Sequence, residues 1–166
     1  MVVGECRRDD VAALERQLPT GRNRYHDARY RRQCDGLSTY LVAWQGDVPV
    51  GAGEVLWQGP KEPEVRDRLP DCPEINGLAV VAERRSRGIG TAIVHAAERL
   101  AAGRGRHRIG VGVDDHNPRA AALYGRLGYR DADCRYLDRY DHVDDDGVRH
   151  EIADPCRFLT KPLAAV

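Results

Sequence analysis

The order of elements between residues 74 and 113 restricts the fold more than any other stretch of the chain. An apolar run from Glu74 to Val81 leads into a basic, glycine-containing turn at residues 84–91. A long amphipathic segment, Ile89 to Ala102, follows, and Gly103 ends it. Apolar residues at helical spacing line one face of this segment: Ile89, Ile93, Ala96, Ala97 and Leu100. A second apolar run, Ile109 to Val113, comes next. Strand, turn, helix and strand in this order predict a fold of the α/β class.

The turn at residues 84–91 reads R-R-S-R-G-I-G-T and is the strongest indication of function. A turn between a strand and a helix directs backbone N–H groups and the positive helix end at one point, which suits a phosphate. A Walker-type loop is excluded because no Gly-Lys-Ser/Thr follows. A dinucleotide-binding turn is excluded because Ile93 stands where a small residue is needed. A tight connection with exposed arginines remains the alternative to an anion site.

Further helices and strands are predicted on both sides of this unit. The expected helices are Val11–Leu18, Tyr25–Cys34 and Pro118–Leu127. The expected hairpins join Thr39–Gln45 to Val48–Trp57, and Arg135–Val143 to Cys156–Leu163 with a tip at Asp144–Gly147. Residues 59–73 are rich in proline and predict a loop with at most one helical turn. Without a linker or repeat, residues 1–166 are expected to form a single domain.

Composition argues against several classes of function. The net charge is zero, with 26 basic and 26 acidic residues, so we expect no nucleic-acid partner and no membrane partner. No apolar run approaches a span of about 20 residues, and the first residues lack a signal-peptide pattern. Five cysteines without a C-x-x-C pair and scattered histidines predict no disulfide framework, no metal and a cytoplasmic protein. Neither Ser38 nor Ser86 lies in a serine-hydrolase motif.

A second motif begins about 30 residues after the turn. The residues from Asn117 to Tyr129 fit N-x-x-A-x-x-L-Y-x-x-L-G-Y, and the turn itself fits R-x-x-G-x-G. With both motifs, residues 74–129, about a third of the chain, resemble the GNAT superfamily of acyl-CoA-dependent N-acyltransferases. The resemblance implies the GNAT fold, of class α/β (α+β), with a mixed central sheet of about six to seven strands flanked by about four helices.

The resemblance also implies acetyl-CoA as the acyl donor, with the turn binding the pyrophosphate of coenzyme A. The N–H groups would come from seven consecutive residues: Arg85, Ser86, Arg87, Gly88, Ile89, Gly90 and Thr91. The two glycines would allow the close approach that a Cβ would block. In the family, the preceding strand pairs by its backbone with the pantetheine arm, which here means Leu78, Ala79 and Val80. Asn117 matches an asparagine that contacts the cofactor.

Acyl transfer to an amine needs a group that accepts the amine's proton and one that protonates the departing thiolate. Glu74 lies where some family members carry a catalytic glutamate, so the resemblance implies a general base; a solvated strand-end glutamate is the alternative. Asn76 shares its strand face and is neutral where many relatives have an acid. Tyr124 matches the tyrosine near the thioester sulfur and is the implied general acid, because its phenol has a pKa near 10. A packed aromatic residue is the alternative for Tyr124.

The predicted activity is N-acetyl transfer to a primary amine of a small molecule or protein, by direct attack in a ternary complex. The sequence does not identify the amine, and a homodimer is left open. A non-catalytic module that binds acyl-CoA, or an interaction domain without a ligand, are the alternatives. The acidic segments at residues 114–116 and 141–154 favour solvated turns over contacts to a cationic substrate.

Overall fold

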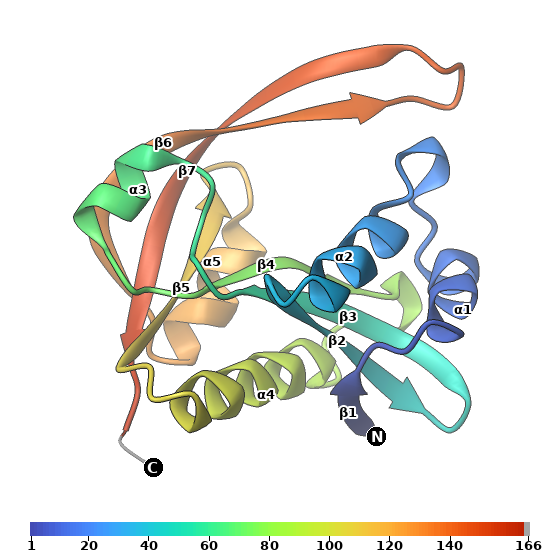
Figure 1. The fold of residues 1–166 in the computed structure, drawn as a ribbon, viewed down its shortest axis with the longest axis horizontal. Coiled ribbons are helices and arrows are strands. Elements are labelled where there is room, and N and C mark those ends of the chain that lie inside the picture. The colour runs from blue at the N-terminus through green and yellow to red at the C-terminus, as the bar shows by residue number, and fades with distance from the viewer. Residues whose placement is uncertain (165–166) are drawn as a thin grey trace.

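The computed structural model describes residues 1–164, in which seven strands form one sheet with helices packed against it (Figure 1). The elements, in chain order, are β1 (Val2–Glu5), α1 (Asp10–Gln17), η1 (Gly21–Asn23), α2 (Tyr25–Cys34), β2 (Ser38–Gln45), β3 (Val48–Leu56), α3 (Pro63–Arg68), β4 (Glu74–Val80), η2 (Ala82–Arg84), α4 (Ile89–Gly103), β5 (Arg108–Asp114), α5 (Pro118–Arg126), β6 (Arg130–Val143) and β7 (Arg149–Pro162). The strand order is β1-β2-β3-β4-β5-β7-β6, and only β4 and β5 are parallel neighbours among the described strands. This mixed sheet confirms the predicted α/β class.

Most predicted elements are present, and the differences have simple causes. The sequence pattern does not predict β1, a four-residue edge strand whose Val2 is exposed and gives no clear alternation. The strands β6 and β7 have 14 residues each, longer than expected, because mostly exposed polar residues extend them toward the hairpin tip. The helical turn allowed for within residues 59–73 is the six-residue helix α3.

Helices cover both faces of the sheet. In β2, Leu41 and Ala43 pack on the α4 side, whereas Tyr40 and Val42 pack with Leu14 of α1. Because side chains alternate along a strand, burial on both faces gives a continuous apolar run rather than an alternating one. The helices α4 and α5 therefore cover one face, and α1 and α2 the other. None of the helices within residues 1–164 is both long enough and apolar enough to span a membrane.

The parallel strands β4 and β5 separate soon after they begin. Two residue pairs join them, Glu74 with Gly110 and Ile75 with Val111, although β4 continues to Val80. On its other side, β4 stays paired with β3 as far as Val80. Within the described chain, the edge of β4 that faces β5 therefore lacks a strand partner over residues 76–80. This opening in the middle of the sheet is the main feature that positions the site.

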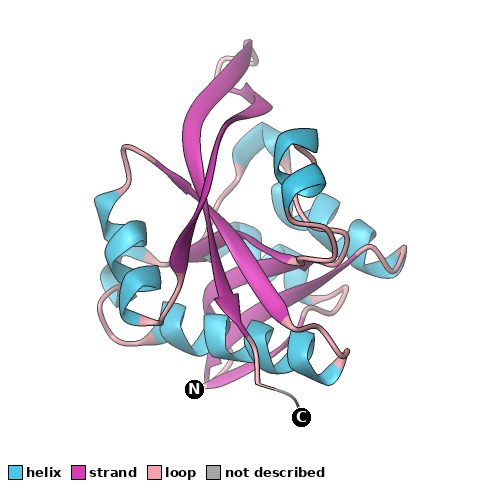
Figure 2. Cartoon of the chain, turned by 90° about the vertical axis from the view of Figure 1, so that its left-hand side faces the viewer, coloured by secondary structure: helices cyan, strands magenta, loops and turns pink. Residues whose placement is uncertain are grey.

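The β6–β7 hairpin arches across the molecule and projects beyond the rest of the sheet (Figures 1 and 2). Its tip rests on η1 and the start of α2. The Asn23 Nδ2 donates to the Val143 carbonyl oxygen at 2.9 Å, and the Val143 N–H donates to Asn23 Oδ1 at 2.8 Å. The Tyr25 hydroxyl donates to the Asp141 carbonyl oxygen at 3.2 Å. Asn23 thus pairs with the strand end much as another strand would.

Replacing Asn23 with alanine is expected to release the hairpin tip. The loss of two hydrogen bonds to the backbone should cost about 1–3 kcal/mol, because the Val143 groups lose their partner. The melting temperature should fall by about 2–12 °C for a chain of this size. Replacement of Glu151, exposed on β7, with alanine serves as the control. Equal melting temperatures for the Asn23 variant and the wild type would contradict this role.

Candidate active site

A cavity of about 740 Å³ lies where β4 and β5 separate and extends beneath the β6–β7 hairpin. Its walls come from α2, β4, β5, α5, the hairpin and residues 58–62. A volume of this size is typical of sites for small molecules. It brings together residues that are far apart in the sequence: Arg29, Glu62, Glu74, Asn76, Asn117, Tyr124, Tyr136 and Asp138.

Glu74 lies at the closed end of the cleft, in the last region where β4 and β5 still pair. Only 4 % of its surface is exposed, so the alternative of a solvated strand-end glutamate is wrong. Burial raises the pKa of Glu74 to about 8, and the nearby Glu62 and Asp138 carboxylates add to the rise. Interactions with the Asn76 side chain and the Gly112 backbone partly offset this shift in pKa. Glu74 can therefore accept or hold a proton near neutral pH.

Tyr124 borders the same cavity from α5 and is also 4 % exposed. It packs edge-to-face on Tyr129, with ring centroids 5.3 Å apart. Burial, with the negative charge of Glu74, raises the pKa of Tyr124 far above its usual range. The phenol therefore stays protonated at neutral pH and is available as a hydrogen-bond donor. Tyr124 is thus a packed aromatic residue, as the alternative predicts. It also borders the cavity, where a ligand could contact it.

Asn117 borders the cavity and is the N-cap of α5. Its Oδ1 accepts a hydrogen bond from the Ala120 N–H at 3.1 Å, which satisfies one of the free donors of the first helical turn. The side-chain oxygen of Asn117 thus has a structural partner. Of the predicted pantetheine contacts, Leu78 borders the cavity, and Ala79 and Val80 continue the free edge of β4.

The basic turn joins this edge to α4. Gly88 is the N-cap of α4 and has a φ of 79°, a conformation that costs glycine little and other residues more. Within residues 1–164, no side chain caps this helix, so the N–H groups of its first turn are open to a ligand. A Cβ at Gly90 would meet Leu123 Cδ2 at 3.6 Å, an ordinary contact. A need for glycine at position 90 would therefore come from a ligand, which stays a prediction.

Two arginines of the turn contact the chain itself. The Arg84 guanidinium donates to Gln45 Oε1 at 3.3 Å, and Arg85 Nε donates to the Val80 carbonyl oxygen at 3.2 Å. Both side chains are exposed, as is Arg87. The turn therefore concentrates positive charge near the free N–H groups of α4, as the sequence predicts for an anion site.

Tyr136 of β6 is a cavity residue that the sequence does not reveal. Its hydroxyl lies against Gly112 of β5, where a Cβ would collide with it. Gly110, two residues earlier on the same strand face, likewise makes room for the ring of Phe158. The signal in the sequence is the alternation of glycines in G-V-G, because small residues on one strand face allow large side chains to cross it.

The acidic segments have mixed roles. Asp114 stabilises a turn as predicted, since its Oδ1 accepts a hydrogen bond from the His116 N–H at 2.7 Å, but it also borders the cavity. Asp144 similarly stabilises the hairpin tip through the Asp146 and Val148 N–H groups. Asp154, however, borders the cavity and accepts a hydrogen bond from the Tyr140 hydroxyl at 2.9 Å. The expectation of a wholly solvated hairpin is therefore wrong for Asp154.

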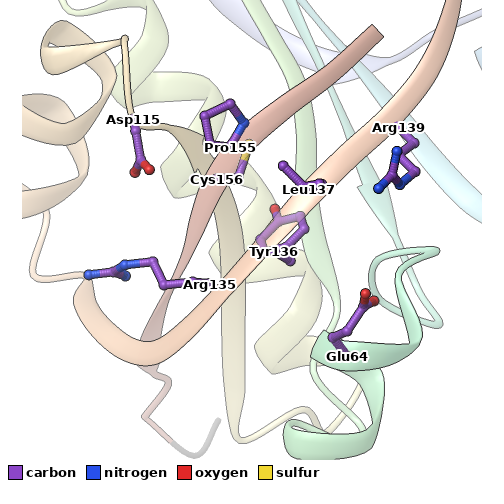
Figure 3. A pocket seen from close by; sticks show the side chains of 8 residues that line it. All are labelled: Glu64, Asp115, Arg135, Tyr136, Leu137, Arg139, Pro155 and Cys156. Atoms are coloured by element: carbon purple, nitrogen blue, oxygen red, sulfur yellow. The ribbon is translucent and has the colours of Figure 1, made fainter. Parts of the chain in front are cut away.

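A second, smaller hollow of about 380 Å³ lies against the hairpin (Figure 3). It is bordered by Glu64 of α3, Asp115 and several residues of β6. Tyr136 and Cys156 border both hollows, so these two side chains separate them. Glu74 and Tyr124 border only the larger of the two, which is the candidate active site.

The sequence of the chain matches the model of a known protein family. A family model described as the acetyltransferase (GNAT) family matches residues 8–129, about three quarters of the chain. The chain belongs to the GNAT family. The matched range includes the basic turn at residues 84–91 and the motif from Asn117 to Tyr129. No curated protein sequence matches this GNAT protein significantly.

Solved structures of other acetyltransferases share the GNAT fold of this chain. The ribosomal-protein-S18-alanine N-acetyltransferase from Escherichia coli has a TM-score of 0.66 at 14 % identity, with 99 % of this chain and 95 % of that chain covered. The yncA protein of Salmonella typhimurium, a putative acetyltransferase with acetyl-CoA, has 0.68 at 15 %, with 98 % and 94 % covered. Arabidopsis thaliana NAA60, in complex with a bisubstrate analogue, has 0.70 at 18 %, with 99 % of this chain and 99 % of that chain covered. At these identities the likeness concerns the fold.

The raised pKa of Glu74 has a consequence for stability. Between pH 4.5 and about 8 the folded chain holds a proton on Glu74 that the unfolded chain releases, so stability falls as the pH rises through this range and then levels off. Replacing Glu74 with glutamine should remove that loss. The free energy of unfolding of the variant, relative to the wild type, should increase by up to about 4–5 kcal/mol between pH 4.5 and 8.5. Urea unfolding at several pH values measures it; a difference that is independent of pH would contradict the buried, protonated carboxyl.

Proposed function

We propose that this GNAT protein transfers an acetyl group from acetyl-CoA to the primary amine of an acceptor, by direct attack within a ternary complex. The observation that carries the proposal is the pairing of Glu74 with Tyr124 at the closed end of the cleft, one poised to accept a proton and the other to donate one. Family membership supports acyl transfer, and relatives of the same fold include structures with acetyl-CoA and with coenzyme A.

The donor is held along the free edge of β4. The backbone of Leu78, Ala79 and Val80 runs along this edge and offers hydrogen bonds to the amides of the pantetheine arm, as a strand partner would, once Arg85 Nε releases the Val80 carbonyl oxygen. The pyrophosphate lies at the turn of residues 85–91, where the N–H groups and the positive end of α4 stabilise it. The direction of the edge then brings the thioester to the closed end of the cleft, beside Glu74.

The chemical step needs two proton transfers. The amine nitrogen forms a bond to the thioester carbonyl carbon, and Glu74, directly or through a water, takes the proton that this nitrogen loses. The carbon–sulfur bond then breaks, and the Tyr124 phenol gives its proton to the sulfur, which leaves as the free thiol of coenzyme A. Tyr124 regains its proton from Glu74 through solvent, so both residues return to their initial states.

Glu74 as the base makes a prediction about pH. The kcat/KM for the acceptor, which reports the site before the acceptor binds, should rise with pH with a pKa of about 8, because only the carboxylate form of Glu74 accepts a proton. In the Glu74→Gln variant this rise with pH should be absent, and the rate should be about 10²–10⁴-fold lower. Profiles with two acceptors whose amines differ in pKa separate the two titrations, since the Glu74 limb stays fixed and an amine limb moves. A limb that remains in the variant would remove Glu74 as the base.

Tyr124 as the acid makes a separate prediction. Tyr124→Phe should lower the rate of thiol release by about 10²–10⁴-fold and leave the affinity for acetyl-CoA nearly unchanged. Tyr129→Phe is the matched control, because Tyr129 stacks on Tyr124 but donates its hydroxyl proton to Glu98 at 3.0 Å. Full activity of the Tyr124 variant would exclude it as the acid. If coenzyme A raises the melting temperature but no amine in a panel releases thiol, the chain is a non-catalytic acyl-CoA-binding module.

A further inference from the structure

The part of the cavity beneath the hairpin has opposite charges on its two sides. Helix α2 contributes Arg29, whereas the loop before α3 contributes Glu62 and β6 contributes Asp138; the exposed Lys61 and Arg66 also border the cavity near these carboxylates. Glu74 lies at the closed end of the cavity, close enough to Glu62 and Asp138 for their charges to act on it. A ligand that fits this space meets a cationic group at one end and carboxylates at the other.

Arg29 is held in place by packing. Its side chain is 16 % exposed, and its guanidinium lies 5.8 Å from the ring centroids of both Tyr25 and Tyr40. It also lies directly against Gly77 of β4, where a Cβ would collide with the guanidinium. Gly77 has a φ of 61°, so the backbone favours glycine for a second reason. Aromatic faces and the glycine fix the guanidinium at the cavity wall before any ligand arrives.

The positive charge of Arg29 is not fully matched by the chain. Glu54 is fully buried, and both of its carboxylate oxygens accept hydrogen bonds from Arg32, at 2.8 and 2.7 Å. Arg29 reaches the same carboxylate only at 3.8 Å. One carboxylate thus serves two guanidinium groups, and the better geometry belongs to Arg32. A net positive charge remains at the Arg29 position, which favours a ligand that brings an anion.

In the described chain, the part of the cavity formed by Glu62 and Asp138 lacks a hydrogen-bond donor and has more negative than positive charge. Glu62 Oε1 is buried and has no hydrogen-bond donor within residues 1–164. Lys61 lies 3.7 Å from this oxygen and 3.3 Å from Asp138 Oδ1, so one cation faces two carboxylates. An ammonium group that enters here supplies both the missing donor and the missing charge. This side lies next to Glu74, where the amine must be for the proposed reaction.

We propose that the acceptor is an amino acid, whose carboxylate binds Arg29 and whose amino group lies on the acidic side beside Glu74; this rests on the proposed function. The spacing fits a short molecule. Gly77, which Arg29 contacts, is three residues from Glu74 on β4, a span of at most about 10 Å. A guanidinium–carboxylate contact and an amine–carboxylate contact take up most of that span, which leaves a few atoms between the two ligand groups. A polyamine would instead place a cation against Arg29.

A matched set of acceptors tests the inference. The probes are the twenty amino acids and the carboxamide of each, assayed by thiol release from acetyl-CoA at pH 8. At least one amino acid should be acetylated with a kcat/KM about 10- to 100-fold above that of its amide, because a guanidinium–carboxylate contact is lost in the amide. The amide has the less basic amine, so intrinsic reactivity acts against this result. Amides that equal or exceed their amino acids would overturn the inference and leave acetyl transfer intact.

Variants of α2 give the second readout. Arg29→Gln should raise the KM for the preferred amino acid about 10- to 100-fold, abolish the preference over the amide, and leave the KM for acetyl-CoA unchanged. Arg29→Lys should recover part of the preference, since it keeps the charge and loses the planar fork. Arg31→Gln is the control, because Arg31 lies on the same helix with its side chain 76 % exposed. An equal loss for amino acids and amides in Arg29→Gln would overturn the assignment.

Binding without turnover separates this inference from the proposed function. With coenzyme A present, the preferred amino acid should raise the melting temperature of the wild type and not that of Arg29→Gln. If no probe is acetylated but this Arg29-dependent shift occurs, acetyl transfer fails and the amino-acid site stands. If neither amino acids nor amides shift the melting temperature or release thiol, the amino-acid site is wrong.

Discussion

The separation of β4 from β5 is the constraint on which the rest of the structure depends. β5 pairs with β7 along its whole length, from Arg108 to Asp114, whereas β4 stays with β3 as far as Val80. The sheet is therefore two antiparallel halves that meet at only two residue pairs. This meeting point lies in the middle of the sheet, and the buried Glu74 occupies it. The free edge of β4, the cavity and the buried carboxylate are thus three consequences of one break in strand pairing.

Glycines on β4 and β5 shape the region where these two strands separate. Gly110 and Gly112 lie on one face of β5, and their lack of a Cβ admits the rings of Phe158 and Tyr136 from the hairpin strands. Gly77 does the same on β4 for the guanidinium of Arg29. In each case a residue distant in sequence fills the space that a glycine leaves. Substituting Gly112 or Gly77 would therefore displace a side chain of the cavity wall, and substituting Gly110 would displace Phe158 in the core.

Local sequence signals predict the parts of the fold that local physics determines. The helix Tyr25–Cys34 and the β4–turn–α4 unit follow from periodicity and glycine positions. Glu74 at the start of this unit and Tyr124 in the Asn117–Tyr129 motif are indicated by the resemblance to the family. The proposed acceptor side of the cavity could not be found in this way, because its groups are contributed by α2, the loop at residues 58–62 and a hairpin whose strands extend well beyond their apolar pattern. Charged residues on an exposed-looking strand, such as Asp138, give no local sign that a tertiary contact makes them cavity residues.

For the proposed role of Glu74 as the base, the carboxylates around it explain how a buried residue can become basic only when the amine has bound. In the empty site, burial and the charges of Glu62 and Asp138 favour the protonated form of Glu74. An ammonium group that binds between these carboxylates adds a positive charge, which lowers the pKa of Glu74 and favours its ionised, basic form. The same ammonium then gives one proton to Glu74, which releases it to solvent, so Glu74 is ionised again when the neutral amine attacks and loses its second proton. Binding of a cationic amine and activation of the base are therefore one electrostatic event. The same burial makes the ionised form of Glu74 unfavourable in the empty protein, so the fold loses stability when Glu74 ionises without a bound amine.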